Sequence, residues 1–219
     1  MHASLKALIL AGLVAASGAK AETCPPTGAF VPKKVVTLST GVGDTVYTAE
    51  RSRNVITAVS HARAGLTTLG LTQNVTEVRI LPQTWSVNLG GGRYCVGLGR
   101  VEASWRITKL FVDIASEYPP GGCNYRIIRE HEGLHVAFAH DTFREWAPRI
   151  EQALREAAER IAPQVTATDP ARVSREIEGR LKAALQPAFD GFRADLSARN
   201  AGIDTAENYR KTLALCPRW

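Results

Sequence analysis

The sequence predicts an α+β fold in which a small antiparallel sheet is followed by helices. Between residues 75 and 118, apolar residues alternate with polar ones, which indicates strands. The segment PPGG at 119–122 then breaks this pattern, and the apolar residues beyond it recur at helical spacing. Because the strands precede the helices instead of alternating with them, the order favours an α+β fold.

The first 21 residues are expected to be a signal peptide. Lys6 precedes an apolar run from Ala7 to Ala16, and the segment ends in the small-residue pattern Ala19-Lys20-Ala21. We therefore expect cleavage after Ala21 and an exported protein, either periplasmic or extracellular. No later segment is long and apolar enough to suggest a membrane span.

Several strands and one short helix are expected before PPGG. VVTLS at 35–39 reads as a strand, and apolar residues at helical spacing predict a short helix between Thr48 and Ala64. Val78 and Ile80 belong to a further strand, and the triple glycine at 90–92 marks a turn. The segments YCVGLGRVEASW and RITKLFVDIASEY follow as two more strands, which gives an antiparallel sheet of at least three strands with one covered face.

Three helices are expected after PPGG. The first has Asn124 as its N-cap and runs towards Trp146, the second begins at Pro148, and the third opens at Asp169-Pro170 and is kinked or broken at Pro187. The apolar residues of the second and third helices recur on one face of each: Ile150, Leu154, Ala157 and Ile161, then Val173, Ile177, Leu181 and Leu185. We expect residues 22–165 to form the α+β domain and residues 166–219 a helical region packed on the same core.

The charge pattern argues against nucleic-acid binding. Lys and Arg number 27 against 21 Asp and Glu, a formal net charge of +6, and two of the lysines lie in the expected signal peptide. The remaining positive charge is spread along the chain, whereas phosphate recognition requires it to be concentrated on one surface. The expected partner is a protein or peptide substrate, and the sequence leaves the oligomeric state open.

The chain contains four cysteines, Cys24, Cys95, Cys123 and Cys216. An even number in an exported protein favours two disulfides, for which three pairings exist. We prefer Cys95–Cys123, which ties a strand to the start of a helix, together with Cys24–Cys216, which joins the two chain ends.

The segment REHEGLHVAFAH at 129–140 contains the motif His-Glu-x-x-His. On a helix, His131 and His135 lie one turn apart on the same face, so both imidazoles can bind one metal ion. Glu132 points about 100° around the helix, where a carboxylate can take a proton from a water activated by the metal. The motif therefore predicts one Zn²⁺ site with a catalytic glutamate.

A simpler interpretation is a helix with two solvated histidines and a surface glutamate. The surrounding sequence favours the metal site over this interpretation. Ile128, His131, His135 and Phe138 follow one another at steps of three, four and three residues. The histidines therefore continue an apolar line that faces the interior, where a metal ion can compensate for their burial.

The chain resembles the zincin metallopeptidases, which share a sheet followed by an HExxH helix. It is most similar to a bacterial family of predicted secreted zinc-dependent proteases whose substrates are generally undefined. The resemblance covers roughly residues 75 to 160, including Cys123 and HEGLHVAFAH at 131–140. It implies a zinc-dependent peptide hydrolase with His131 and His135 as ligands and Glu132 as acid/base. It also implies that an edge strand within 94–115 aligns the substrate. Arg129 and Glu130 depart from the uncharged residues that zincins prefer before the motif.

A third metal ligand is expected, since catalytic zinc sites usually have three protein ligands. His140 is the nearest candidate, but it lies roughly 140° around a straight helix from His135, so the helix would have to end or distort. A downstream carboxylate is the alternative, and Asp141, Glu145 and Glu151 are possible. Four tyrosines could each stabilise an oxyanion, with nothing to select among them: Tyr94, Tyr118, Tyr125 and Tyr209.

The sequence thus predicts a secreted zinc metalloprotease that uses Glu132 as general base. The alternative is a periplasmic zinc-binding or protein-interaction module with a degenerate motif, whose functional surface would be the helices at 149–198. A zinc hydrolase that acts on a non-peptide amide is a third possibility.

Overall fold

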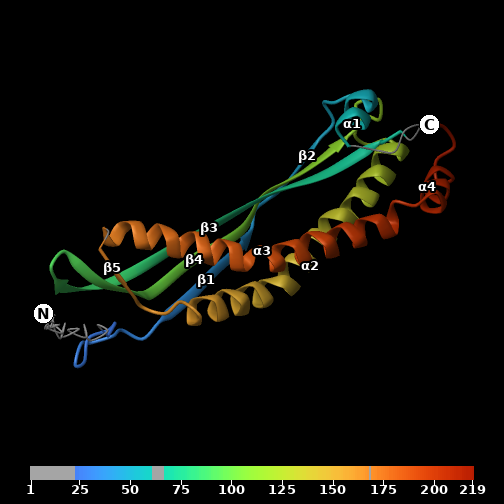
Figure 1. Cartoon of the computed structure of the whole chain (residues 1–219). Helices are drawn as coiled ribbons and strands as arrows, with labels where there is room; N and C mark the ends of the chain where they lie inside the picture. Colours follow the sequence, from blue (N-terminus) through green and yellow to red (C-terminus); the bar gives the residue numbers. More distant parts are fainter. Residues whose placement is uncertain (1–22, 61–66, 168) are drawn as a thin grey trace, which may run out of the picture.

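The computed structural model describes residues 23–60, 67–167 and 169–219, so the expected signal peptide lies outside the described residues. The described residues form an elongated molecule in which long strands and two long helices run side by side (Figure 1). The elements follow in the order β1 (Val35–Val42), β2 (Thr45–Thr48), α1 (Arg53–Val59), β3 (Gly70–Gly90), β4 (Arg93–Ile114), α2 (Cys123–Glu159), β5 (Gln164–Thr166), α3 (Pro170–Ile203) and α4 (Ala206–Leu213).

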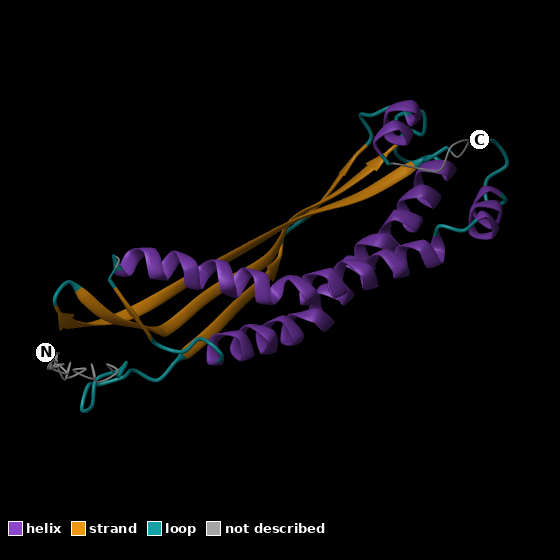
Figure 2. Ribbon diagram, viewed as in Figure 1, coloured by secondary structure: helices purple, strands orange, loops and turns teal. Residues whose placement is uncertain are grey.

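Strand β4 is the centre of the sheet. On one edge it pairs antiparallel with β3, from Gly70↔Ile114 to Gly90↔Arg93. On the other edge it pairs with β5, β1 and β2 in succession, and β1 and β2 run parallel to it. The expected antiparallel sheet is therefore only partly correct, because the sheet is mixed. Its second edge consists of the short strands β5, β1 and β2, which share β4 as their partner and can be followed in Figure 2.

Two of the expected strands form a single strand, β4, in the β3–β4 hairpin. The predicted turn is confirmed, since Gly90, Gly91 and Gly92 all have positive φ (85°, 58° and 73°), a conformation open mainly to glycine. Beyond it, no turn separates YCVGLGRVEASW from RITKLFVDIASEY. The alternation of buried residues continues across their junction, through Val101, Ala103, Trp105 and Ile107, so both segments form a single strand of 22 residues.

The first two helices expected after PPGG are also one element. Helix α2 continues from Cys123 to Glu159 with Pro148 in its interior. An interior proline costs about 3 kcal/mol. The packing of residues on both sides of it, such as Phe143 and Ile150 in the core, offsets that cost. The N-cap is Gly122 and not the predicted Asn124, whose Nδ2 instead donates to the carbonyl of Arg218 at 2.7 Å.

Helix α3 begins as predicted, with Asp169 as N-cap accepting from the Ala171 amide and Pro170 in the first turn. It is not broken at Pro187, but continues to Ile203. None of the described helices has both the length and the apolar character needed to cross a membrane.

One core holds the two long helices on the sheet. The predicted apolar faces are buried, including Ile150 and Leu154 of α2 and Leu181 and Leu185 of α3. They belong to the same cluster as residues of β1, β3 and β4. Trp105 of β4 lies within it, 1% exposed, with ring centroids 4.0 Å from Phe143 of α2 and 5.0 Å from Phe192 of α3. The two helices are thus fixed to the sheet and to each other.

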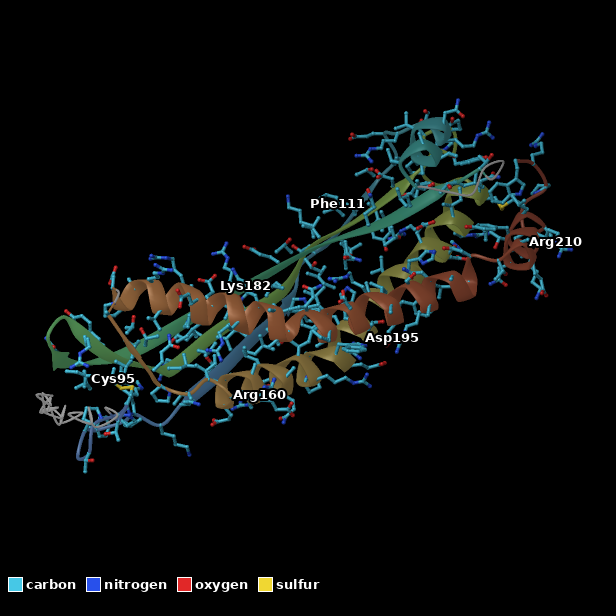
Figure 3. The ribbon with its side chains drawn as sticks, in the orientation of Figure 1. Cys95, Phe111, Arg160, Lys182, Asp195 and Arg210 are labelled. Atoms are coloured by element: carbon cyan, nitrogen blue, oxygen red, sulfur yellow. A yellow bond between two sulfur atoms is a disulfide. The ribbon has the colours of Figure 1, made fainter. Side chains whose placement is uncertain are left out.

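The two disulfides join Cys24 to Cys95 and Cys123 to Cys216, so the preferred pairing is wrong. The length of β4 gives the reason. Cys95 lies near the start of the strand, and the 19 residue-to-residue steps from Cys95 to Ile114 extend roughly 60 Å at about 3.3 Å per step. Cys95 and Cys123 therefore lie at opposite ends of the molecule, and Figure 3 shows Cys95 far from α4. Two disulfides are consistent with an exported protein.

Gly191 is predicted to be required where α3 crosses α2. A Cβ at this position would lie 2.2 Å from the ring of Trp146, and that ring is held by a 2.9 Å hydrogen bond from its Nε1 to Asp195. We expect Gly191→Ala to lower the free energy of unfolding by about 1–3 kcal/mol, because the added methyl overpacks the contact.

Gly179→Ala is the matched control for this prediction, since it lies in the same helix and its Cβ would meet nothing within 4 Å. It should raise stability by up to about 1 kcal/mol through helix propensity alone. Urea unfolding of both variants measures the two effects, and equal behaviour would show that the α2–α3 contact tolerates a methyl group.

Candidate metal centre

Side chains from α2 form a group that could hold a metal ion. The ligand atoms of His131, Glu132 and His135 all lie within 4.8 Å of one another. This is the one such group found in the described parts of the chain. Both histidines lie on the helix face predicted to turn inwards, where His135 is buried and His131 is half-buried. The helical spacing of the motif thus brings these three residues together as expected.

Asp204 completes the group from a distant part of the sequence. It is the C-cap residue of α3, and its Oδ1 lies 3.1 Å from His131 Nε2 and 3.3 Å from His135 Nε2. Neighbouring ligand atoms around one tetrahedral zinc lie about 3.3 Å apart when the bonds are close to 2.0 Å. One carboxylate oxygen therefore lies where it can share a cation with both imidazoles.

Asn200 fixes the orientation of the His135 ring. Its Oδ1 lies 2.9 Å from His135 Nδ1, so an Nδ1–H can donate to it and leave Nε2 directed at Asp204. A metal-binding histidine normally has its second nitrogen bonded in this way. Burial alone would lower the pKa of His135, but the hydrogen bonds with Asp204 and Asn200 and the charge of Glu132 raise it above its ordinary value.

Glu132 is held on the other side by the first residues of β3. The hydroxyl of Thr72 lies 2.8 Å from Glu132 Oε2 and can donate to it. Gly70 makes room for the carboxylate, because a Cβ there would lie 2.6 Å from Oε1. Burial raises the pKa of Glu132, although His135, the Thr72 hydroxyl and His131 act in the opposite direction. The strand thus places a carboxylate of increased basicity beside the imidazoles.

Tyr209 of α4 lies over the same group. Its hydroxyl donates to Asp204 Oδ1 at 3.0 Å, and its ring centroid is 5.7 Å from that of His131. Burial alone would raise the pKa of Asp204, but the hydrogen bonds with His131 and His135 outweigh it and lower that pKa well below its ordinary range. Burial and the adjacent Asp204 carboxylate raise the pKa of Tyr209, so its phenol stays protonated at neutral pH.

The residues expected to supply a third ligand lie elsewhere. Helix α2 is continuous through His140, so the distortion that would turn this side chain towards the site does not occur, and His140 is not part of the group. The three alternative carboxylates pair with arginines: Asp141 with Arg144, Glu145 with Arg199 and Glu151 with Arg155. The structure brings Asp204 to the site instead.

Sequence analysis did not identify Asn200, Asp204 or Thr72 as site residues. Thr72 and Asn200 precede and follow the motif by about 60 residues, so no local spacing relates them to it. Asp204-Thr205 does carry a signal, since Thr205 caps α4 and marks a break between two helices. Polar residues at such a break are candidates for a site, but the sequence does not show which helix face they approach.

We predict that Asp204→Asn lowers the affinity for Zn²⁺ by more than about 100-fold, because losing a ligand should exceed the 10–100-fold effect of an outer-shell change. His140→Ala should leave the affinity unchanged. Isothermal titration with Zn²⁺ measures both, with circular dichroism to verify folding. The opposite ranking would assign the third ligand to His140.

The Cys123–Cys216 disulfide is predicted to hold the C-terminal half of the site in place. It links the start of α2 to the residues just beyond α4, and therefore restrains Asp204 and Tyr209. Replacing both cysteines by serine should weaken Zn²⁺ binding.

The control for this effect is the same double replacement at Cys24 and Cys95, at the other end of the molecule. The two disulfides span 71 and 93 residues, so removing either should cost a similar stability of about 4 kcal/mol. Equal Zn²⁺ affinities in the two folded variants would show that the tether does not act on the site.

Comparisons with known proteins do not identify a family. No family model, no curated protein and no solved structure matches the chain. The geometry of the described group is therefore the basis for the chemistry proposed below.

Proposed function

We propose that the chain is an exported zinc-dependent hydrolase that cleaves peptide bonds. The observation that carries the proposal is the joint approach of His131, His135 and Asp204 with Glu132 beside them. Two imidazoles and one carboxylate are a donor set that suits zinc, and three protein ligands leave a position for reaction. Without the approach of Asp204 to both imidazoles, the motif would be explained equally well by two histidines that share a helix face.

In this proposal His131, His135 and Asp204 would hold the zinc ion, which would supply a Lewis acid for the substrate carbonyl and for the attacking water. The other functions belong to the chain itself. Glu132 accepts the proton of the attacking water and transfers it to the departing amine nitrogen. Thr72 and Gly70 position its carboxylate for both transfers. Because Glu132 is 4% exposed, bulk water does not solvate the carboxylate and weaken it as a base.

Tyr209 is proposed to act on the substrate oxygen. Of the four tyrosines considered from the sequence, it is the one whose hydroxyl contacts Asp204 of the group. Its protonated phenol can donate a hydrogen bond. When the carbonyl is attacked and its oxygen gains negative charge, the phenol would donate to that oxygen in place of Asp204.

Glu132→Gln is predicted to retain Zn²⁺ and to lower hydrolysis by at least about 100-fold, since the amide cannot accept the proton. Glu130→Gln is the matched control, because Glu130 is the exposed neighbour of the motif. The assay is mass-spectrometric detection of products from a proteome-derived peptide library, with metal content measured on the same samples.

Each outcome distinguishes the candidate functions. Chelator-sensitive cleavage that is lost in Glu132→Gln supports the hydrolase. Full activity of a metal-replete Glu132→Gln protein contradicts the mechanism. Tight Zn²⁺ binding without cleavage of any peptide supports the alternative, a metal-binding or interaction module, or an enzyme acting on a non-peptide amide.

A further inference from the structure

The free edge of β3 leads away from the candidate site. Among the described strands, β3 pairs only with β4, so its other edge has no strand partner. The expectation that an edge strand lies within 94–115 is therefore wrong, because that region is β4, paired on both edges. The first residues of β3, Gly70 and Thr72, contact Glu132, so the edge starts beside the proposed catalytic base.

Seven consecutive residues of β3, from Gln73 to Arg79, are exposed. The only charged residues among them, Glu77 and Arg79, form an ion pair with each other at 2.6 Å. Edge strands that avoid pairing usually carry unpaired charges, bulges or proline. Here Pro82, which lacks an N–H, comes only after the exposed stretch. The pairing is irregular between Val75 and Thr76, but the extra residue there, Thr108, belongs to β4, so β3 itself is continuous along this edge. The exposed edge can therefore accept the main chain of an extended polypeptide.

A pocket of about 310 Å³ adjoins the far end of this stretch, between β3 and α3. Val78 and Ile80 of β3 and Phe189 and Phe192 of α3 form its apolar wall, with Trp105 beneath them. Lys182 and Arg193 of α3 lie at its rim, each paired with an acidic residue of its own helix, and Figure 3 marks Lys182 on α3 alongside the hairpin. The pocket thus suits a large uncharged side chain.

The pocket and the candidate site lie on the same face of β3. Alternate residues of a strand share a face, so Thr72 beside Glu132 and Val78 in the pocket point to the same side. Six residues of strand separate them, which corresponds to about 20 Å. A peptide paired with this edge would have the same rise per residue and would present alternate side chains to this face.

We propose that β3 and this pocket bind extended polypeptide substrates, with a large apolar side chain in the pocket about six residues from the cleaved bond. The inference rests on the proposed peptide hydrolysis and defines its substrate as an unfolded or extended chain of at least about eight residues. Main-chain pairing with the edge supplies affinity, and the pocket supplies selectivity.

The test compares Val78→Glu with Val75→Glu. The two valines are similarly exposed (37% and 48%), but they lie three residues apart and so on opposite faces of β3. The probes are fluorescent 12-residue peptides of Ser, Thr and Gly, with or without one Phe, and binding is measured by anisotropy on Zn²⁺-loaded Glu132→Gln protein. We expect Val78→Glu to weaken binding of the Phe peptide at least about tenfold. Val75→Glu should change it less than about twofold.

The cleavage products of the active protein show how far along the peptide the cleaved bond lies from the residue in the pocket. Mass spectrometry should locate the cleaved bond about six residues from Phe, and kcat/KM should fall in Val78→Glu for long peptides but not for tetrapeptides that cannot reach the pocket. Binding without any cleavage would refute the hydrolase and leave the peptide site supported. Equal binding by the two variants, or equal binding of the Phe-free peptide, would show that no side chain enters the pocket and would overturn the proposed selectivity. If the protein binds no peptide but forms a dimer that Val78→Glu dissociates, the β3 edge binds a second copy of the chain, and the peptide site is overturned.

Discussion

Pairing with β4 is the constraint on which the rest of the structure depends. Each of the other described strands bonds to it, and none of them pairs with any other. Its buried face supplies Val101, Trp105 and Ile107, against which the long helices pack. The length of this one strand therefore sets the length of the molecule and the distance between its ends. It also determines which cysteines can meet.

Local features of the fold were predictable, whereas features set by tertiary packing were not. The glycine turn at 90–92 and the Asp169-Pro170 helix start were predicted correctly, because each depends on backbone preferences of a few residues. Helices α2 and α3 continue through Pro148 and Pro187, where a helix start and a kink or break were expected, because packing along the sheet outweighs the local cost of proline. The parallel pairing of β1 and β2 has no local signature, since alternation in a strand does not encode its direction.

The candidate site shows the same division. His131, Glu132 and His135 could be grouped from the sequence because one helix carries all three. Asp204 and Thr72 could not, because each is brought in by an element whose position depends on the core around Trp105. The candidate site is therefore a product of the whole fold: α2 provides the imidazoles, β3 holds Glu132, and the end of α3 provides the remaining carboxylate. A change in how α3 packs on α2 would reach the imidazoles through Asp204.

The position of Asp204 at the end of α3 has an electrostatic consequence beyond its side chain. The aligned peptide dipoles of a helix place about half a negative charge at its C-terminus, and the effect is confined to the last turn. The last turn of α3 is the one that carries Asn200 and ends at Asp204, next to His131 and His135. The main chain therefore adds its own negative potential at the imidazoles. Part of the negative potential at this candidate site therefore requires no ionisable group and is insensitive to pH.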